Sequence, residues 1–526
     1  LENISLSKII NEKWILKGKN SKKITLNAYS KLQKAYLEYS HNIKDKHRTI
    51  IIPDNDNGKK FDEYFLTLTA FNGTHALRPH NRKYYFNSFE DTFEPIYYDG
   101  MLQLDLPFSQ NNEKIISSIK NLGSIKDYTP LVNNLNNLND ILIKFKNSIK
   151  DSENITNENG KNLVEIFFYN SIENIKSNEK KIKKIFDNAK KKDVKLFSDI
   201  DTFEKYLNNI NKHQVNQVTL ISLNEDENNI LGKTNDEKTY KFSVNDLSKI
   251  ISRKSFQEKS FVLIQKDHQI EKKTDKIKIL NHEKIGKIKF SEGINLEINN
   301  KNNIINIFQK NKKDWISFND SQLDDWEINF FGSTKKQKNI LVSSERINEY
   351  GLTGCLNFYN SNFNNTSINI DTSYCEDGLN IIKSKGNLAN INVKNSNSDA
   401  IDLDFSEIKI NSLFVSNAKN DCLDVSGGVY IIQNFESTFC GDKGISVGEK
   451  STVNIKSFQI KNSNIGISSK DLSNTIIKNT NIENVEICFE VKQKKQEFGG
   501  AKLIIENEEF NCKEKSIVDK NSELII

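Results

Sequence analysis

DGLNII at residues 377–382, DAIDLD at 399–404 and DCLDVS at 421–426 are three copies of one pattern, and KGISVG at 443–448, IGISSK at 465–470 and ICFEVK at 487–492 continue it. Each copy starts 22 residues after the previous one (399 − 377). The third and fifth positions are apolar in every copy except at Ser469, and the fourth position is always polar. This in-out-in alternation predicts one short β-strand in each repeat.

A period near 22 residues predicts a right-handed parallel β-helix from about Gly354 to about Ala501, because each coil must travel once around and stack on the previous one at about 4.8 Å. A leucine-rich repeat has a similar period, but its Leu-x-x-Leu-x-Leu pattern is missing. The second position of every copy is small, which predicts a tight inward corner. These small residues are Gly378, Ala400, Cys422, Gly444, Gly466 and Cys488.

The pattern along the chain predicts four regions. Residues 1–110 mix helical periodicity with short aromatic strands and read as α+β, and residues 111–215 read as a helical region. Residues 216–275 read as a small β-containing connector. Residues 276–526 are assigned to the β-helix with an N-terminal cap and a C-terminal end, because terminal coils must be covered.

Composition narrows the class of protein. The 526 residues predict two to four domains, and no apolar run approaches the roughly 18 residues that a membrane span needs. A net charge of +5 from 75 basic and 70 acidic residues does not call for a specific nucleic-acid partner. We expect a monomer. The chain begins at Leu1, so an upstream segment is expected and export stays open.

Six cysteines are present, and none forms a Cys-x-x-Cys pair. A disulfide framework is expected in short chains with a small core, which this chain is not, and structural zinc is unlikely without a Cys/His spacing. We therefore interpret Cys422 and Cys488 as buried small residues rather than reactive thiols.

Carboxylates gather on the repeat. Stacking places Asp399 one coil from Asp421 and Asp402 one coil from Asp424, with Asp404 and Asp442 nearby. Three alternatives follow. Asp399 and Asp421 accept backbone N–H bonds at a corner; the set binds substrate or Ca²⁺; or Asp399 and Asp421 are the catalytic acid and base of a glycan-active enzyme.

The segments Asn397-Ser-Asp399, Asn420-Asp421-Cys422 and Gly441-Asp-Lys-Gly444 resemble the Asn-Thr-Asp, Asp-Asp-Cys and Gly-His-Gly motifs of polygalacturonases. By this resemblance Asp399 and Asp421 match two catalytic aspartates of that family. Asn420 stands where the family has a third carboxylate, and Lys443 stands where it has histidine. We therefore expect a binding surface formed by Asp402, Asp404, Asp424 and Asp442 rather than hydrolysis.

The stretch from Gly354 to Ala501 also resembles bacterial β-helix proteins that are often fused to a CotH-like kinase domain. Residues 75–87 and 93–100, containing His75, His80, Asn81 and Asp99, resemble the catalytic and metal loops of CotH-type kinases. That resemblance implies that Asn81 and Asp99 hold Mg²⁺ on ATP and that His75 or His80 belongs to the catalytic loop. The first 70 residues are too few for a full ATP-binding lobe, so the kinase-like fragment is expected to be truncated or degenerate.

Together these observations predict a polysaccharide-binding or polysaccharide-associated β-helix joined to an inactive kinase-like remnant, in an extracellular, periplasmic or cell-envelope protein. Two alternatives stay open. One is an active enzyme, either a CotH-type kinase or a glycan hydrolase, lyase or epimerase that uses the Asp399/Asp421 face. The other is an adhesion scaffold without a ligand.

Overall fold

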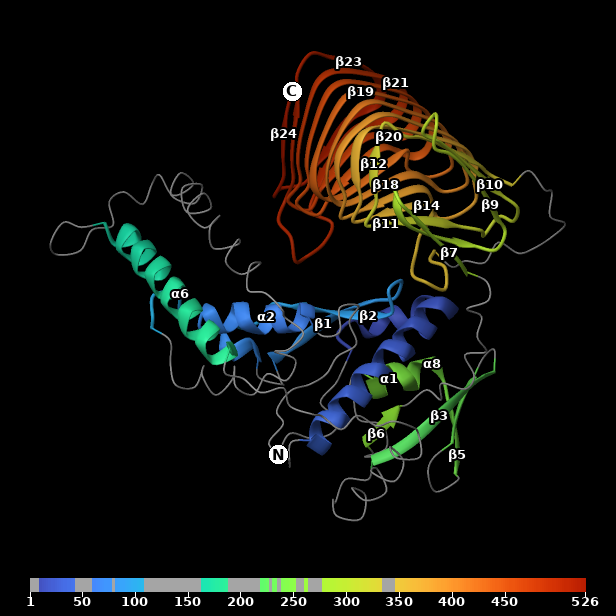
Figure 1. Cartoon of the computed structure of the whole chain (residues 1–526). Helices are drawn as coiled ribbons and strands as arrows, with labels where there is room; N and C mark the ends of the chain where they lie inside the picture. The colour runs from blue at the N-terminus through green and yellow to red at the C-terminus, as the bar shows by residue number, and fades with distance from the viewer. Residues whose placement is uncertain are drawn as a thin grey trace. The chain divides into compact units, whose positions relative to one another are not determined.

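The computed structural model describes residues 9–42, 59–77, 81–107, 162–187, 218–226, 229–233, 238–251, 260–263, 277–333 and 346–526 (Figure 1). The chain forms two compact units. One contains Leu1–His268 with Glu349–Gly351, and the other contains Gln269–Asn348 with Leu352–Ile526.

The first unit is mixed α and β. Its helices are η1 (Glu12–Lys17), α1 (Lys19–Asn42), α2 (Lys59–Ala70), η3 (Thr74–Leu77), α6 (Leu163–Asp187) and α8 (Val244–Ile251). Its strands are β1 (Lys83–Asn87), β2 (Thr92–Ile96), β3 (Val218–Asp226), β4 (Asn229–Lys233), β5 (Thr239–Phe242) and β6 (Ser260–Leu263). β1 and β2 form an antiparallel hairpin, and the other four strands form a sheet in the order β5-β4-β3-β6.

Small cores hold this unit together. Phe61 and Phe65 of α2 pack in one cluster with Phe93 of β2 and Ile182 of α6. In α6, Ile175 and Ile182 are buried while the lysines at 176, 180, 181 and 184 are exposed. The helix therefore has an apolar stripe opposite a charged, solvated face.

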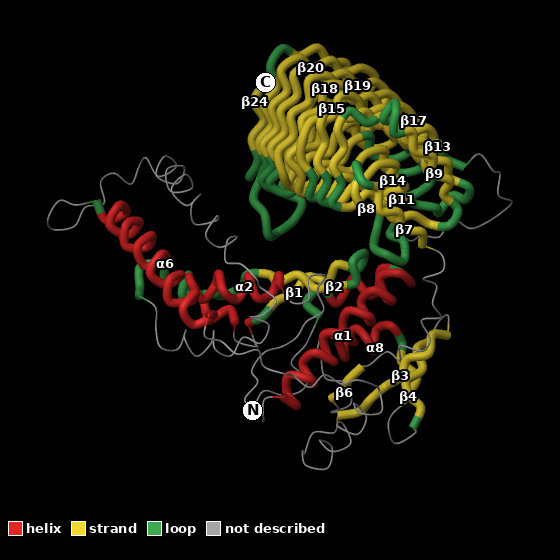
Figure 2. The backbone as a smooth tube through the Cα atoms, in the orientation of Figure 1, coloured by secondary structure: helices red, strands yellow, loops and turns green. Residues whose placement is uncertain are grey.

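The second unit is the predicted parallel β-helix, drawn as stacked arcs in Figures 1 and 2. Its strands are β7 (Ile277–His282), β8 (Gly286–Ser291), β9 (Ile294–Asn299), β10 (Ile304–Gln309), β11 (Ile316–Asn319), β12 (Gln322–Asp324), β13 (Glu327–Phe331), β14 (Gly354–Tyr359), β15 (Asn362–Ser373), β16 (Asp377–Ile382), β17 (Lys385–Ser396), β18 (Asp399–Ala418), β19 (Leu423–Gly448), β20 (Thr452–Lys470), β21 (Asn474–Lys492), β22 (Lys502–Ile505), β23 (Glu508–Val518) and β24 (Glu523–Ile525).

The register confirms the 22-residue repeat. Leu379 pairs with Ile401, Ile401 with Leu423, and Ile467 with Phe489, all in parallel ladders. These apolar side chains are fully buried. At the one polar exception, the buried Ser469 hydroxyl lies 2.8 Å from that of Ser473 and 3.1 Å from that of Thr475, so a local hydroxyl cluster satisfies it.

The small-residue column marks a close approach, as predicted. A Cβ added at Gly444 would collide with the Ile460 side chain, and one added at Gly466 would lie 2.7 Å from the Cys488 carbonyl oxygen. Larger side chains are excluded here because neighbouring coils pack directly against this corner.

Antiparallel strands cover the first coils. β8 pairs antiparallel with β7 and with β11, and β11 pairs parallel with β14. The residue offset between paired strands is 23 from Ile305 to Ile328 but 40 from Ile328 to Ile368, and the ladder stays parallel through both steps. Extra chain length between coils therefore leaves the sheet register unchanged. β22–β24 form the C-terminal end.

The cysteines correct the sequence analysis. All six form disulfides, Cys355–Cys375, Cys422–Cys440 and Cys488–Cys512, with Cα–Cα distances of 5.3, 5.4 and 5.7 Å. Cys422 and Cys488 are buried as expected, but the interpretation as unpaired thiols is wrong. The partners are 18 to 24 residues apart, close to one coil, so the chain returns each cysteine to its partner after about one turn.

Replacing Cys422 and Cys440 together by alanine should lower the free energy of unfolding by about 3 kcal/mol, because the closed loop restricts the unfolded chain. Thermal unfolding of the oxidised protein measures this. Thiol titration of the intact, denatured protein should find no free thiol, and six free thiols there would contradict the pairing.

Candidate functional site

Successive coils bring six aspartates onto one surface of the β-helix, which we term the aspartate face: Asp377, Asp399, Asp402, Asp404, Asp421 and Asp424. The ladder pairs Asp377 with Asp399, and Asp402 with Asp424. The sequence analysis named five of these residues and missed Asp377. Its signal was present in the sequence, since Asp377 precedes Asp399 by one 22-residue period.

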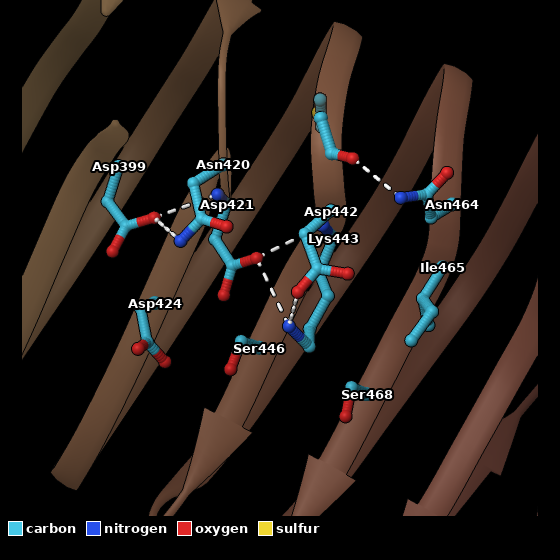
Figure 3. Close-up of polar contacts among 12 residues, drawn as sticks. Asp399, Asn420, Asp421, Asp424, Asp442, Lys443, Ser446, Asn464, Ile465 and Ser468 are labelled. Carbon is cyan, nitrogen blue, oxygen red and sulfur yellow. Dashed lines mark hydrogen bonds and ion pairs between the residues drawn. The ribbon is translucent and has the colours of Figure 1, made fainter. Parts of the chain in front are cut away.

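Two of the aspartates cap the backbone of the next coil, as the first alternative predicts (Figure 3). Asp399 Oδ1 accepts the backbone N–H of Asp421 at 2.8 Å and an amide N–H of Asn420 at 2.6 Å. Asp421 Oδ1 accepts the backbone N–H of Lys443 at 3.1 Å. One oxygen of each carboxylate is therefore structural, and Figure 3 shows the other oxygen of each turned toward the side where Asp424 lies.

Asp377 and Asn380 occupy the coil before Asp399. Asp377 is 2% exposed, and its Oδ2 has no hydrogen-bond partner among the described residues. Asn380 is 1% exposed and donates to Asp404 Oδ2 at 3.3 Å, while its own Oδ1 has no partner there. Two buried acceptors at the aspartate face thus lack a donor, which is costly in a folded protein.

Burial dominates the electrostatics. It raises the pKa of Asp421 to about 7, although Lys443 opposes the shift, and it raises the pKa of Asp404 to about 6. Burial and then the neighbouring carboxylates Asp377 and Asp404 raise the pKa of Asp402 well above its usual range. The pKa values of Asp377 and Asp399 are raised as well, again chiefly by burial. Withdrawal from water and mutual repulsion both favour protonation here.

Lysines end the face on the side of later coils. The Lys443 ammonium lies 3.3 Å from Asp421 Oδ1 and also pairs with Asp442, whose side chain is 39% exposed. Because Lys443 serves two carboxylates, its charge does not prevent the raised pKa of Asp421. The buried Lys470 donates to the Ser446 hydroxyl at 2.7 Å, and burial lowers its pKa.

Exposed phenylalanines stand at both corners of this strand layer. Phe405 follows Asp404 at φ +48° and is 59% exposed, and Phe439 lies three residues before Asp442 at φ +59° and is 61% exposed. Positive φ is unfavourable for a bulky side chain. At the position equivalent to Phe439 the neighbouring coils place Asn395, Asn417, Asn462 and Asn484, all at positive φ. The two phenylalanines are thus both strained and solvent-facing.

A groove of about 570 Å³ opens beyond the Phe405 corner. Its lining includes Lys385 and Lys409, with Glu407 between them, and the apolar side chains of Val429 and Ile431. The sequence analysis did not find this groove, because its residues belong to strand positions that carry no common motif.

The kinase-like residues of the first unit also meet. His75 Nδ1 lies 2.9 Å from the Asp99 carbonyl oxygen and 2.9 Å from the Asn81 side-chain nitrogen, and the β1–β2 hairpin separates Asn81 from Asp99 as expected. His80 lies outside the described residues. The Asn81 amide contacts His75 through its nitrogen, so this arrangement is a hydrogen-bonded cluster around the imidazole.

Among the described residues, no three His, Cys, Asp or Glu side chains are placed so that together they could hold a metal ion. The residues present therefore do not form a ready site for Ca²⁺ at the aspartate face or for Mg²⁺ at Asn81 and Asp99. Both metals, and ATP, stay predictions. No helix of the described part has the length and hydropathy required to cross a membrane.

In comparisons with protein-family models, curated proteins and solved structures, nothing matches the chain. The resemblances to polygalacturonases and to CotH-type kinases therefore stay predictions.

The raised pKa values predict how stability changes with pH. Because protonation of these carboxyls is favoured in the folded state, the folded chain binds more protons than the unfolded chain between about pH 4 and pH 7. The free energy of unfolding should therefore fall as pH rises through this window. Asp421→Asn should reduce the fall and raise the melting temperature at pH 8.

Glu436→Gln, at an exposed position of β19, is the matched control and should leave the profile unchanged. Melting curves from pH 4 to pH 8 provide the measurement. A profile of Asp421→Asn that superimposes on the wild-type profile would show that the buried aspartate does not carry the effect.

Proposed function

We propose that the protein is a glycan-binding protein and that the aspartate face, with Phe405 and Phe439 at its two corners, is the binding surface. The observation that carries the proposal is the pair of exposed phenylalanines held at positive φ. Strain of this kind costs of order 1–3 kcal/mol and is found mostly where function requires it.

The chemistry of the surface supports a sugar ligand. Aromatic rings present flat apolar area on which the C–H faces of a sugar ring can pack. Carboxylates are acceptors for its hydroxyl hydrogens, and Asp402, Asp404 and Asp424 are only partly buried. Apolar surface with a few placed polar groups is the usual composition of a ligand site.

The disulfides support an exported protein. All six cysteines are paired, and paired cysteines persist in oxidising compartments outside the cytosol. A location at the cell surface or in the extracellular space fits a ligand that is itself an extracellular polymer.

Glycan cleavage is a second candidate function, favoured by one observation. The carboxyl of Asp421, with its pKa raised to about 7, is suited to donate a proton to a glycosidic oxygen near neutral pH. In that case Asp421→Asn would abolish release of reducing ends while leaving glycan affinity unchanged. Release of reducing ends unaffected by this substitution would exclude the role.

Binding of the full chain to a panel of soluble polysaccharides, measured by isothermal titration calorimetry, tests the main proposal. Phe439→Asn should weaken binding by about tenfold or more. The same substitution should leave the fold intact or stabilise it by about 1 kcal/mol, since asparagine tolerates positive φ and occupies this position in four other coils.

Phe308→Ala removes another partly exposed phenylalanine of the β-helix and serves as the matched control. Its affinity should equal that of the wild type. Equal affinity for Phe439→Asn, Phe405→Asn and wild type, or no binding to any polysaccharide, would contradict the proposal.

A further inference from the structure

The aspartate face carries far more negative than positive charge. Glu376 and Asp442 adjoin its six aspartates, which makes eight carboxyl groups in three successive coils. The cations around it are already engaged. Lys443 pairs with Asp421 and Asp442, Lys470 donates to Ser446, and Arg346 lies 2.5 Å from Glu376.

The hydrogen-bond donors on the face are neutral. Asp399 receives the Asn420 amide and the Asp421 backbone N–H, Asp404 receives the Asn380 amide, and Asp424 receives the backbone N–H of Val425. Neutral donors satisfy geometry but do not compensate charge. Asp402, whose strongest charged neighbours are Asp377, Asp404 and Asp424, lies at the centre of this uncompensated region.

A second, independent observation points to a missing donor. Asp377 Oδ2 and Asn380 Oδ1 are buried and unpartnered, and both residues belong to β16, the strand next to Asp399 and Asp402. Asn380 reaches into the face, because its amide nitrogen bonds to Asp404. The surplus is therefore one of acceptors as well as of charge.

We propose that the glycan bound at the aspartate face carries free amino groups, each held as an ammonium by the carboxylates of Asp402, Asp404 and Asp424. This inference rests on the proposed glycan-binding function and names its ligand class. An ammonium group supplies three donors and one positive charge, which match the two surpluses of the site. A uronate-bearing glycan would be repelled.

The repeat suits a polymer of amino sugars. Asp402 and Asp424 are one coil apart, and coils stack at about 4.8 Å, a spacing comparable to the length of one sugar unit in an extended chain. A chain running along the β-helix axis thus meets a carboxylate on each of two successive coils. Two linked contacts strengthen binding beyond either one alone.

Calorimetry with the full-length oxidised protein tests the inference, using a glucosamine oligomer with free amines, its fully N-acetylated counterpart of equal length, and a uronate oligomer. The amine form should bind at least about tenfold more tightly than the acetylated form, with an affinity that falls as salt rises. The uronate oligomer should bind most weakly.

Asp402→Asn with Asp424→Asn keeps the shape of both side chains and removes their charge. This double variant should lose the preference for the amine form and keep its affinity for the acetylated form. Its melting temperature at pH 8 should not fall, because repulsion is relieved, so a loss of preference cannot be attributed to misfolding. Glu436→Gln, an exposed charge on the same strand as Asp424, should keep the preference.

The outcomes separate the two proposals. Equal affinity for amine and acetylated oligomers overturns the ammonium inference and leaves glycan binding in place, whereas no binding to any oligomer overturns both. Spermine that competes as well as the glucosamine oligomer would show attraction to positive charge alone and overturn the inference. Tightest binding to the uronate oligomer in the presence of Ca²⁺ would overturn it in favour of a calcium bridge.

Discussion

The ladder of parallel hydrogen bonds between successive coils is the constraint on which the rest of the β-helix depends. Once Leu379, Ile401 and Leu423 are held in register, every other residue of those coils must also stack on its counterpart one period away. The interior benefits, because identical apolar positions form continuous columns without voids, as where Phe435 and Phe458 stack with ring centroids 5.0 Å apart. The exterior has no such freedom, since any charge that recurs in the sequence becomes a row of like charges in space.

The aspartate face shows how that cost is divided. Asp399 and Asp421 offset repulsion by each giving one oxygen to the backbone of the following coil, and Lys443 neutralises the last position of their column. Asp402 and Asp404 receive no comparable compensation from a cation, and burial keeps their pKa values raised. The same stacking that stabilises the core therefore concentrates unfavourable electrostatics on one strand layer. A region that is costly to the fold and open to solvent is where a binding role explains most.

Periodicity decided what could be predicted from the sequence. The apolar columns, the small corner and the stacking of Asp399 on Asp421 follow from one 22-residue repeat, and the structure has all three. The disulfides could not be found in this way, because Cys422 and Cys440 belong to different columns and meet only through the path of the coil. Phe439 could have been found, since it interrupts a column of asparagines, but the abundance of asparagine in the chain was interpreted as a codon effect. The contacts of His75 with Asn81 and Asp99 depend on how a hairpin closes, which spacing alone does not define.

The tolerance of the ladder to a 40-residue step between Ile328 and Ile368 separates two kinds of sequence change. Residues added between coils leave the faces as they are, whereas addition of one whole period inserts a new coil and shifts nothing else. Duplication of residues 399–420 would thus extend the carboxylate rows by one step. The number of coils then acts as a molecular ruler, and the length of polymer that such a surface can recognise becomes a heritable quantity that changes in discrete units.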